Sequence, residues 1–285
     1  MPKSLRVRPN QRMKLSRWRA RLWKLRPAAL VAALVRRLDR SGLHARSVIG
    51  RLVEVGGNRV TLDGLTFSVG NPLITTREKG LLYLGLHESQ EIALVRQHLV
   101  AELPVIELGG GIGVVSCIIN RILAHPRDHT VVEANPDLIP TLETNRRINR
   151  CQFQIRNVAL AYDGPEIALA IDSFASSRVD GVGQRQVHVK TTTLALLLQE
   201  SGFARINLVA DIEGAEVHLV EQEGRLLSQH VRTLILETHP RFTGVERATQ
   251  MLAAIESLGF VETARSYNVL AFRNCAFDMR DHPAR

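Results

Sequence analysis

A glycine-rich segment between an acidic residue and an apolar helix constrains the fold of this chain most. It reads Glu107-Leu-Gly-Gly-Gly-Ile-Gly113 and follows the apolar stretch 103–106. Because glycine has no Cβ, it adopts positive φ without strain and lets backbone N–H groups approach a ligand. A second acid, Glu133, follows a second apolar stretch one strand–helix unit later, where a carboxylate can bind ribose hydroxyls. The pattern predicts a nucleoside site whose turn contains Gly109, Gly111 and Gly113.

Two nucleoside cofactors fit this pattern to different degrees. A nicotinamide dinucleotide site has G-x-G-x-x-G with an acid about 20 residues later, and its pyrophosphate lies at the helix N-terminus. Here the spacing is G-x-G-x-G, and Glu107 directly precedes the turn. Its carboxylate would repel a pyrophosphate and attract the ammonium and sulfonium of S-adenosylmethionine. The charge of Glu107 therefore favours the methyl donor, whereas the spacing of Glu133 fits both cofactors.

The positive charge of the chain is concentrated at its N-terminus. Residues 1–51 hold 15 Lys and Arg against one acid, and the remainder holds 22 basic and 27 acidic residues. A net negative body argues against broad nucleic-acid binding. Leu15, Trp18 and Leu22 fall at helical spacing among arginines, which predicts either peripheral contact with an anionic membrane or a solvated tail. No apolar run approaches the roughly 20 residues of a membrane span.

The three cysteines are widely separated and lack the spacing of metal ligands. They are expected to be reduced thiols, which favours a cytoplasmic location, with a peripheral membrane location left open by the basic arm. No Cys/His cluster suggests a metal, and none is expected.

The chain divides into four predicted parts. These are a basic N-terminal arm, a small β cap with a lead-in helix, a donor-binding domain and a tail: residues 1–47, 48–103, 104–275 and 276–285. In the cap, residues 51–55 and 59–63 are expected to pair as a hairpin around Gly56–Asn58, with 65–69 as a third strand. A helix over 88–100 is expected to precede the first core strand.

From residue 105 onward, strand and helix patterns alternate, interrupted by a polar, glycine-containing stretch at 172–186. This alternation predicts an α/β fold with a doubly wound, mostly parallel sheet. The last two strands are joined by only 264–267, too short for a parallel crossover, so the last strand is expected to be antiparallel. The expected strands are 105–108, 130–133, 153–158, 206–210, 231–237, 260–263 and 268–273, and the expected helices are 113–124, 137–149, 193–200, 214–228 and 245–258.

Ligands of open α/β sheets bind beyond the carboxyl ends of the strands. Polar or small residues follow five of the predicted strands and are expected to meet in one crevice: Glu107 to Gly113, Glu133 with Ala134 and Asn135, Asn157 with Val158 and Ala159, Asp211 to Glu216, and Glu237 to His239.

The segment Asp211-Ile-Glu-Gly-Ala-Glu216 places two carboxylates directly after an apolar strand, where they are costly unless a cation or a donor meets them. Asp211 is expected to contact a ligand, whereas Glu213 fits a ligand contact and a helix cap equally well. Glu216 is expected to be a surface acid near the helix N-terminus. His239 has a side chain whose ordinary pKa of about 6.5 suits a base, and a structural role is equally open.

Taken together, these motifs resemble the FkbM family of S-adenosylmethionine-dependent methyltransferases over about residues 70–273. The resemblance implies a Rossmann-like class I methyltransferase fold and methylation of hydroxyl oxygens on sugars, polyketides and related natural products. It implies that Glu107 and the glycines hold the methionine moiety, Glu133 the ribose, 157–159 the adenine, and Asp211 the donor's amino end or the acceptor. The matching segments are Gly85-Leu-His-Glu88, 107–113, Glu133-Ala-Asn-Pro136, Val158-Ala-Leu160, Thr191-Thr-Thr-Leu194, 211–216 and Leu236-Glu-Thr-His239. By the same resemblance, Glu88, Ala134 and Asn135 belong to the donor site.

Three positions depart from the family pattern. The glycine loop has Glu107, Gly110 and Gly111 where the family usually has Asp-Ile-Gly-Ala-Asn. The usual lysine two residues before the Asp211 position is Val209, and the usual aspartate after Thr-Leu is Ala195. The last two departures leave the class of substrate open.

The function expected from these residues is O-methylation of a small-molecule or glycan hydroxyl, chemistry that does not require a metal. His239 is the first choice for the base and Asp211 the second, with Glu213 and Glu237 orienting the acceptor. One alternative is a nicotinamide oxidoreductase, which Glu107 and the closing hairpin disfavour. The other is a non-catalytic, donor-binding or membrane-associated scaffold, which the substitutions at Val209 and Ala195 and the basic arm motivate.

Overall fold

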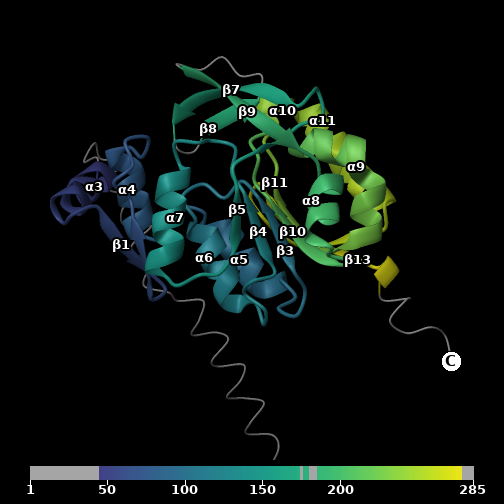
Figure 1. Ribbon diagram of the computed structural model, residues 1–285, viewed down its shortest axis with the longest axis horizontal. Coiled ribbons are helices and arrows are strands. Elements are labelled where there is room, and N and C mark those ends of the chain that lie inside the picture. The colour runs from purple at the N-terminus through teal and green to yellow at the C-terminus, as the bar shows by residue number, and fades with distance from the viewer. Residues whose placement is uncertain (1–44, 174–175, 180–184, 278–285) are drawn as a thin grey trace, which may run out of the picture.

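The doubly wound sheet is present in the computed structural model, which describes residues 45–173, 176–179 and 185–277 (Figure 1). Nearly all of the predicted basic arm and tail lies outside these residues. The central sheet has seven strands in the order β12-β13-β11-β10-β3-β4-β5. β13 lies between β11 and β12 and is antiparallel to both, which confirms the expected direction of the last strand. The strands are β3 (Val105–Leu108), β4 (His129–Val132), β5 (Gln154–Arg156), β10 (Ile206–Ala210), β11 (Val231–Glu237), β12 (Phe260–Ser266) and β13 (Val269–Asn274).

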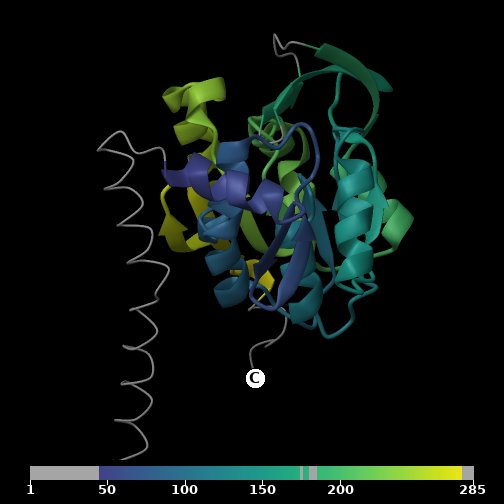
Figure 2. The ribbon, with the colours of Figure 1, turned by 90° about the vertical axis from the view of Figure 1, so that its left-hand side faces the viewer.

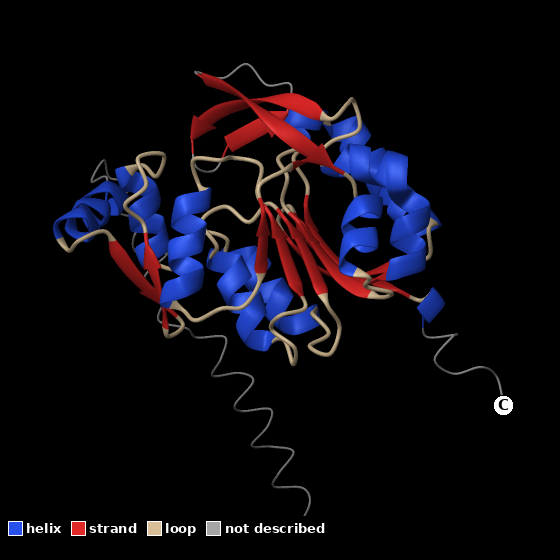
Figure 3. Ribbon diagram, viewed as in Figure 1, coloured by secondary structure: helices blue, strands red, loops and turns tan. Residues whose placement is uncertain are grey.

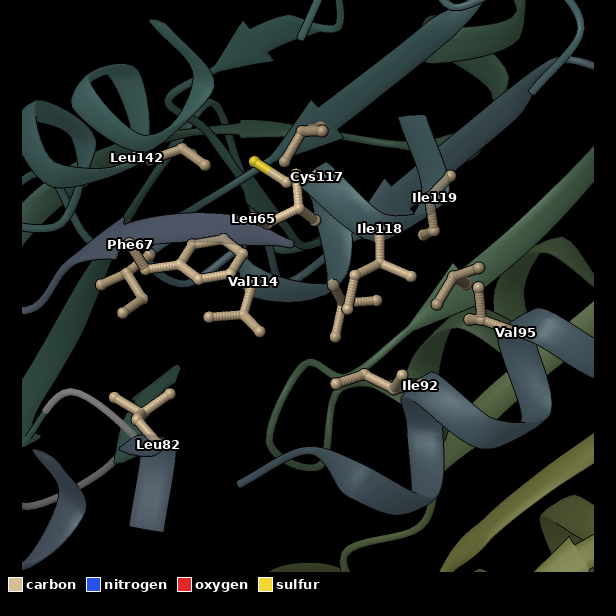
Figure 4. Close-up of a cluster of buried hydrophobic side chains, with 14 of the residues drawn as sticks. Leu65, Phe67, Leu82, Ile92, Val95, Val114, Cys117, Ile118, Ile119 and Leu142 are labelled. Atoms are coloured by element: carbon tan, nitrogen blue, oxygen red, sulfur yellow. The ribbon is translucent and has the colours of Figure 1, made fainter. Parts of the chain in front are cut away.

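Helices cover both faces of this sheet (Figure 3). Every residue of β3 and β10 is buried, because helices pack on both sides of these strands. On one face, Ile92, Val95 and Ile118 belong to a cluster that extends to Phe67 of the cap (Figure 4). This face carries α5 (Ser89–His98), α6 (Val114–Ile122) and α7 (Ile139–Ile148), and the other carries α8 (Leu194–Ser201), α9 (Glu216–His230) and α11 (Val245–Ser257), with the short α10 (Pro240–Thr243) before α11.

Among the described residues, no helix is both long enough and apolar enough to cross a membrane. The three cysteines are free thiols, as expected.

A second, four-stranded sheet was not expected from the sequence. It has the order β6-β9-β7-β8 and includes part of the polar stretch 172–186. One face of β9 is mostly exposed, so its strand pattern is weaker than that of the buried core strands. The sheet lies above one end of the central sheet (Figures 1 and 2). Its strands are β6 (Ala159–Leu160), β7 (Glu166–Ser173), β8 (Ser176–Val179) and β9 (Arg185–Thr192).

The predicted strand at 51–55 was wrong. These residues end the helix α3 (Ala45–Val55), and the hairpin is formed instead by β1 (Arg59–Leu62) and β2 (Leu65–Ser68). The sequence Arg-Leu-Val-Glu-Val over 51–55 is too short to distinguish a strand from about one and a half turns of helix. The residues expected to form a third strand are therefore the second strand of the hairpin.

Glycines allow α3 to pack directly on α4 (Thr76–Tyr83). A Cβ on Gly80 would lie 1.9 Å from the carbonyl oxygen of Arg46, and one on Gly50 would lie 1.7 Å from that of Thr76. Neither position has room for a side chain, so the two helix backbones are in contact. Lys79 of α4 and Glu54 of α3 add an ion pair with a separation of 3.0 Å.

We expect Gly80→Ala to destabilise the protein by about 1–3 kcal/mol, because the added methyl group must separate the two helices. Alanine is otherwise favoured over glycine within a helix by about 1 kcal/mol. A loss of stability in this variant would therefore reflect the contact between α3 and α4 and not helix propensity. Thermal unfolding followed by circular dichroism measures the effect, with Gln250→Ala at an exposed helical position as the control. An unchanged midpoint for Gly80→Ala would contradict the close packing.

Candidate active site

A cavity opens beyond the carboxyl ends of β3, β4 and β10. Of the residues predicted for the site, those that line it are Glu88, Gly109, Gly111, Glu133, Ala134, Val158, Ala159, Asp211 and Glu213. Seven further residues line it. His87, Leu160, Ile212 and Ala215 lie within the motifs quoted above but were given no role of their own, whereas Val132, Leu138 and Leu169 are apolar and were missed because they belong to no motif. Because the carboxyl ends of the parallel strands meet at one edge of the sheet, residues up to about half the chain apart line the same cavity.

The glycine turn follows β3 and packs on the backbone that follows β10. Gly109 has φ of 93°, and a Cβ there would lie 1.8 Å from the carbonyl oxygen of Asp211. Gly113 does not line the cavity. It is the N-cap of α6 with φ of 85°, and a Cβ there would lie 2.6 Å from Leu142 Cδ1. Gly113 therefore serves the packing of the helix and not the cavity wall.

Glu133 at the end of β4 is the buried carboxylate of the cavity, with 6% of its surface exposed. Its two oxygens accept hydrogen bonds from Gly111 N–H at 2.6 Å and Asn135 N–H at 2.7 Å. Burial raises the pKa of Glu133 to about 7, against the lowering effect of these two hydrogen bonds. The carboxylate is held in place and retains lone pairs for a ligand.

Asn135 and Asn157 do not line the cavity. The Asn157 side-chain amide donates to the carbonyl oxygens of Glu133 at 2.8 Å and Ala134 at 3.1 Å. Asn135 accepts from Asp137 N–H at 3.0 Å. The two asparagines hold the loop after β4 in shape, which differs from the direct donor contact expected of them.

Glu107 is not among the residues that line the cavity. Its carboxylate is 1% exposed, accepts from Ser116 Oγ at 2.7 Å and lies 2.9 Å from Nε2 of His129 at the start of β4. Both oxygens are therefore engaged inside the core, and the side chain does not reach the cavity in which a contact with the methionine moiety was expected. The charge argument that favoured the methyl donor over a pyrophosphate loses its basis, because this charge does not face the cavity.

Four carboxylates surround His239, which is 6% exposed. Nδ1 lies 3.1 Å from Glu216 Oε1. On the other side of the ring, Nε2 lies 3.3 Å from Asp211 Oδ1, 3.6 Å from Glu213 Oε2 and 4.0 Å from Glu237 Oε1. The strand ends of β10 and β11 thus supply one compact cluster, which we call the His239 cluster. His239 and Glu237 belong to it but do not line the cavity.

The electrostatics of this cluster contradict His239 as a base at neutral pH. Burial alone would lower the pKa of His239, but the hydrogen bond and charge of Glu216, with the charges of Asp211 and Glu213, outweigh it and raise the pKa to about 9. The imidazole is then protonated at pH 7 and has no lone pair to accept a proton.

The prediction that Glu216 is a surface acid was also wrong. Glu216 is 1% exposed, and its carboxylate accepts from Ile212 N–H at 2.8 Å and Gly214 N–H at 2.9 Å. Neither Asp211 nor Glu213 caps α9, whose N-cap is Ala215. Glu213 has φ of 53° and pairs with Arg241 at 3.1 Å. Glu216 therefore stabilises the turn from its buried side. Asp211 and Glu213 do not take part in this hydrogen bonding, and both line the cavity.

Two further acids from the start of α5 face the same region. Glu88 lines the cavity, and Glu91 is buried with 6% exposure. Burial raises the pKa of both carboxyls, and the charge of Asp211 adds to the effect on Glu91. Glu91 was not found from the sequence, because a single acid within an amphipathic helix gives no signal.

The strand order, with β13 antiparallel between β11 and β12, and the cavity beyond the parallel strands define a Rossmann-like class I methyltransferase fold. Residues 107–262, more than half of the chain, match the methyltransferase FkbM domain. The chain therefore belongs to the FkbM family of methyltransferases. A comparison with curated proteins gave no match.

Among solved structures, a protein of the NADB-Rossmann superfamily from Streptococcus agalactiae is 11% identical with a TM-score of 0.40, covering 64% of this chain and 67% of its own. Aeropyrum pernix fibrillarin, solved with natively bound S-adenosyl-L-methionine, is 12% identical with a TM-score of 0.39 and coverages of 64% and 73%. Precorrin-6y C5,15-methyltransferase from Geobacter metallireducens is 13% identical with a TM-score of 0.39 and coverages of 72% and 90%. These scores are too low to support any comparison of function.

We expect Glu107→Ala and His129→Ala each to lower the free energy of unfolding by about 3–5 kcal/mol, because each leaves its buried partner uncompensated. The double variant should lose clearly less than the sum of the two, since the pair acts as a unit. Urea unfolding measures all three variants, with Glu102→Ala on the surface as the control. Strictly additive losses would show that the two side chains are not coupled.

Proposed function

We propose that this methyltransferase uses S-adenosylmethionine as its donor and methylates a hydroxyl oxygen on a sugar, a glycan or a natural product. The observation that supports this best is a shared cavity. Glu133 and the glycine turn line one part of it, and Asp211 and Glu213 line another. A donor held by the first group would present its methyl group toward the second.

The donor fits the cavity in three parts. Glu133 is placed to accept hydrogen bonds from the ribose hydroxyls, since a carboxylate at the end of the second strand of such sheets binds ribose. Ala134, Val158 and Ala159 supply an apolar surface for the adenine ring. Glu88 and Asp211 carry the charges that complement the donor's ammonium and sulfonium, a role that Glu107 does not fill.

Methyl transfer requires little covalent chemistry from the protein. The sulfonium–methyl bond breaks as the bond from the acceptor oxygen forms, so the main task is to align the two in a near-attack geometry. The hydroxyl proton must pass to a nearby base. Asp211 replaces His239 as first choice for that role, because Asp211 lines the cavity and His239 lies behind it. We assign Glu213 and Glu237 the task of orienting the acceptor and the other side chains of the His239 cluster.

The two residues that motivated a non-catalytic scaffold lie away from the cavity. Val209 is buried in β10, paired in register with Glu107. Ala195 lies at the start of α8, where its N–H donates to Glu223 at 2.8 Å. Neither substitution removes a group from the cavity wall, which supports a catalytic role. Membership of a methyltransferase family weighs against the nicotinamide oxidoreductase.

Donor affinity should depend on the ionisation of Glu133, whose pKa of about 7 is raised by burial and, to a smaller extent, by the charge of Glu107. The ionised carboxylate accepts hydrogen bonds from the ribose hydroxyls. The affinity for the donor should therefore be highest at pH 8, where Glu133 is mostly ionised, and should fall as the pH drops through 7. We expect the Kd of S-adenosylhomocysteine to rise about tenfold between pH 8 and pH 6 in calorimetric titrations. Glu133→Gln should bind weakly at both values. A wild-type Kd that does not change with pH would contradict this role.

Methyl transfer itself is tested with S-adenosylmethionine labelled in its methyl group and a panel of sugars, glycans, polyketide alcohols and amines. We expect label in a hydroxyl-bearing acceptor and, at a saturating concentration of the donor, a kcat at least about 100-fold lower for Asp211→Asn. Glu221→Gln, an exposed carboxylate paired with Arg247, is the matched control for the loss of a charge. Label only in amines would refute O-methylation, and full turnover by Asp211→Asn would refute the assigned base.

A further inference from the structure

The His239 cluster has the ligand geometry of a metal site. Nδ1 of His239 faces Glu216, which is itself fixed by the N–H groups of Ile212 and Gly214. A carboxylate that accepts from one ring nitrogen orients the ring and leaves the other nitrogen to bind a metal, an arrangement common around metal-binding histidines. Nε2 is the nitrogen left over here, and a bound cation would displace the proton that this nitrogen carries in the metal-free cluster.

The separation of Nε2 from Asp211 Oδ1 is that of two ligands of one ion, and Glu213 Oε2 lies slightly farther from Nε2. Two ligands bound at about 2.1 Å, with an angle of about 90–110° between the bonds, lie about 3.0–3.4 Å apart. Nε2 is 3.3 Å from Asp211 Oδ1 and 3.6 Å from Glu213 Oε2. Asp211 Oδ1 is buried and accepts no hydrogen bond, even though Nε2 is near. Nε2 and Oδ1 thus lie at ligand spacing with no hydrogen bond between them, and Asp211, Glu216 and His239 each offer a ligand atom within 4.8 Å of the other two.

The charge of the cluster also favours a cation. Asp211, Glu213, Glu216 and Glu237 all lie within 4.0 Å of the His239 ring nitrogens. The one other cationic side chain with an ion pair to these carboxylates in the described structure is Arg241, which is 64% exposed. Several carboxylates held together in a largely buried place are costly unless they are paired or bind a metal.

We propose that Asp211, Glu213 and His239 bind a divalent metal ion, with Glu216 positioning the histidine and Glu237 beside the site. One imidazole with carboxylates suits Mn²⁺ and its neighbours in the first transition row better than a soft ion. This reverses the expectation of no metal. The expectation rested on the absence of a Cys/His motif, whereas these ligands come from the ends of two adjacent strands.

The position of the ion would suit the proposed reaction. Asp211 and Glu213 line the cavity, so the ion would meet the acceptor oxygen and lower the pKa of its hydroxyl. The proton would pass to the oxygen of Asp211 that does not bind the ion, as the oxygen–methyl bond forms and the sulfonium becomes a thioether. Metal binding does not depend on this step and is tested without donor or acceptor.

The full-length protein, freed of metal by dialysis against a chelator, is titrated with MnCl₂ and followed by electron paramagnetic resonance. We expect one saturable site per chain and, in the electron spin echo envelope, coupling of Mn²⁺ to one imidazole ¹⁴N. His239→Gln keeps all four carboxylates and should abolish this coupling and weaken binding at least tenfold. Glu221→Gln, which removes a carboxylate on the exposed part of α9, should bind within twofold of the wild type.

The wild-type spectrum alone can overturn the proposal, so the test does not depend on the folding of a variant. No saturable binding at millimolar Mn²⁺, or binding without ¹⁴N coupling, would show that the carboxylates form no metal centre with His239. Equal affinity in folded His239→Gln would do the same. Because the readout is binding, its failure is distinguishable from a failure of methyl transfer.

Discussion

The close approach of Gly109 to the backbone of Asp211 is the constraint on which the cavity depends. The turns after β3 and β10 touch backbone to backbone there, and Asp211 N–H donates to the carbonyl oxygen of Leu108 at 2.9 Å. This contact holds the glycine turn, residues 109–113, against the turn at 211–216 that carries the carboxylates. Since the first carries the region assigned to the donor and the second the region assigned to the acceptor, one contact sets the distance between both halves of the proposed reaction.

The protein contains two buried histidine–carboxylate groups, and their surroundings indicate a structural role for one and a functional role for the other. Glu107 and His129 lie in the core, where Ser116 engages the remaining oxygen and nothing opens to the cavity. A lysine in place of Val209, as the family usually has, would lie beside Glu107, whereas here the carboxylate pairs with His129 on the neighbouring strand β4. In the His239 cluster, by contrast, one ring nitrogen is engaged by Glu216 and the other faces carboxylates that reach the cavity.

The sequence predicted the central sheet and half of the site for physical reasons. A run such as 206–210 is apolar throughout because both of its faces are covered, and the residue after it must lie at the ligand-binding edge. The direction of the Glu107 side chain could not be predicted, because it depends on pairing with His129, 22 residues away in the chain. The pKa of His239 likewise arises from acids on the turn after β10, whereas the histidine itself follows β11, and the wall residue Leu169 belongs to a strand with no strong pattern.

Leu169 lies on β7 of the second sheet, and in the described structure this sheet shares no paired strand with the central one. The wall that it forms therefore rests on a scaffold separate from the strand ends that carry Glu133 and Asp211. Substitutions along β7 can reshape that wall while the strand ends stay in register. The shape of this wall and the placement of the strand-end carboxylates are therefore set by two independent sets of backbone hydrogen bonds.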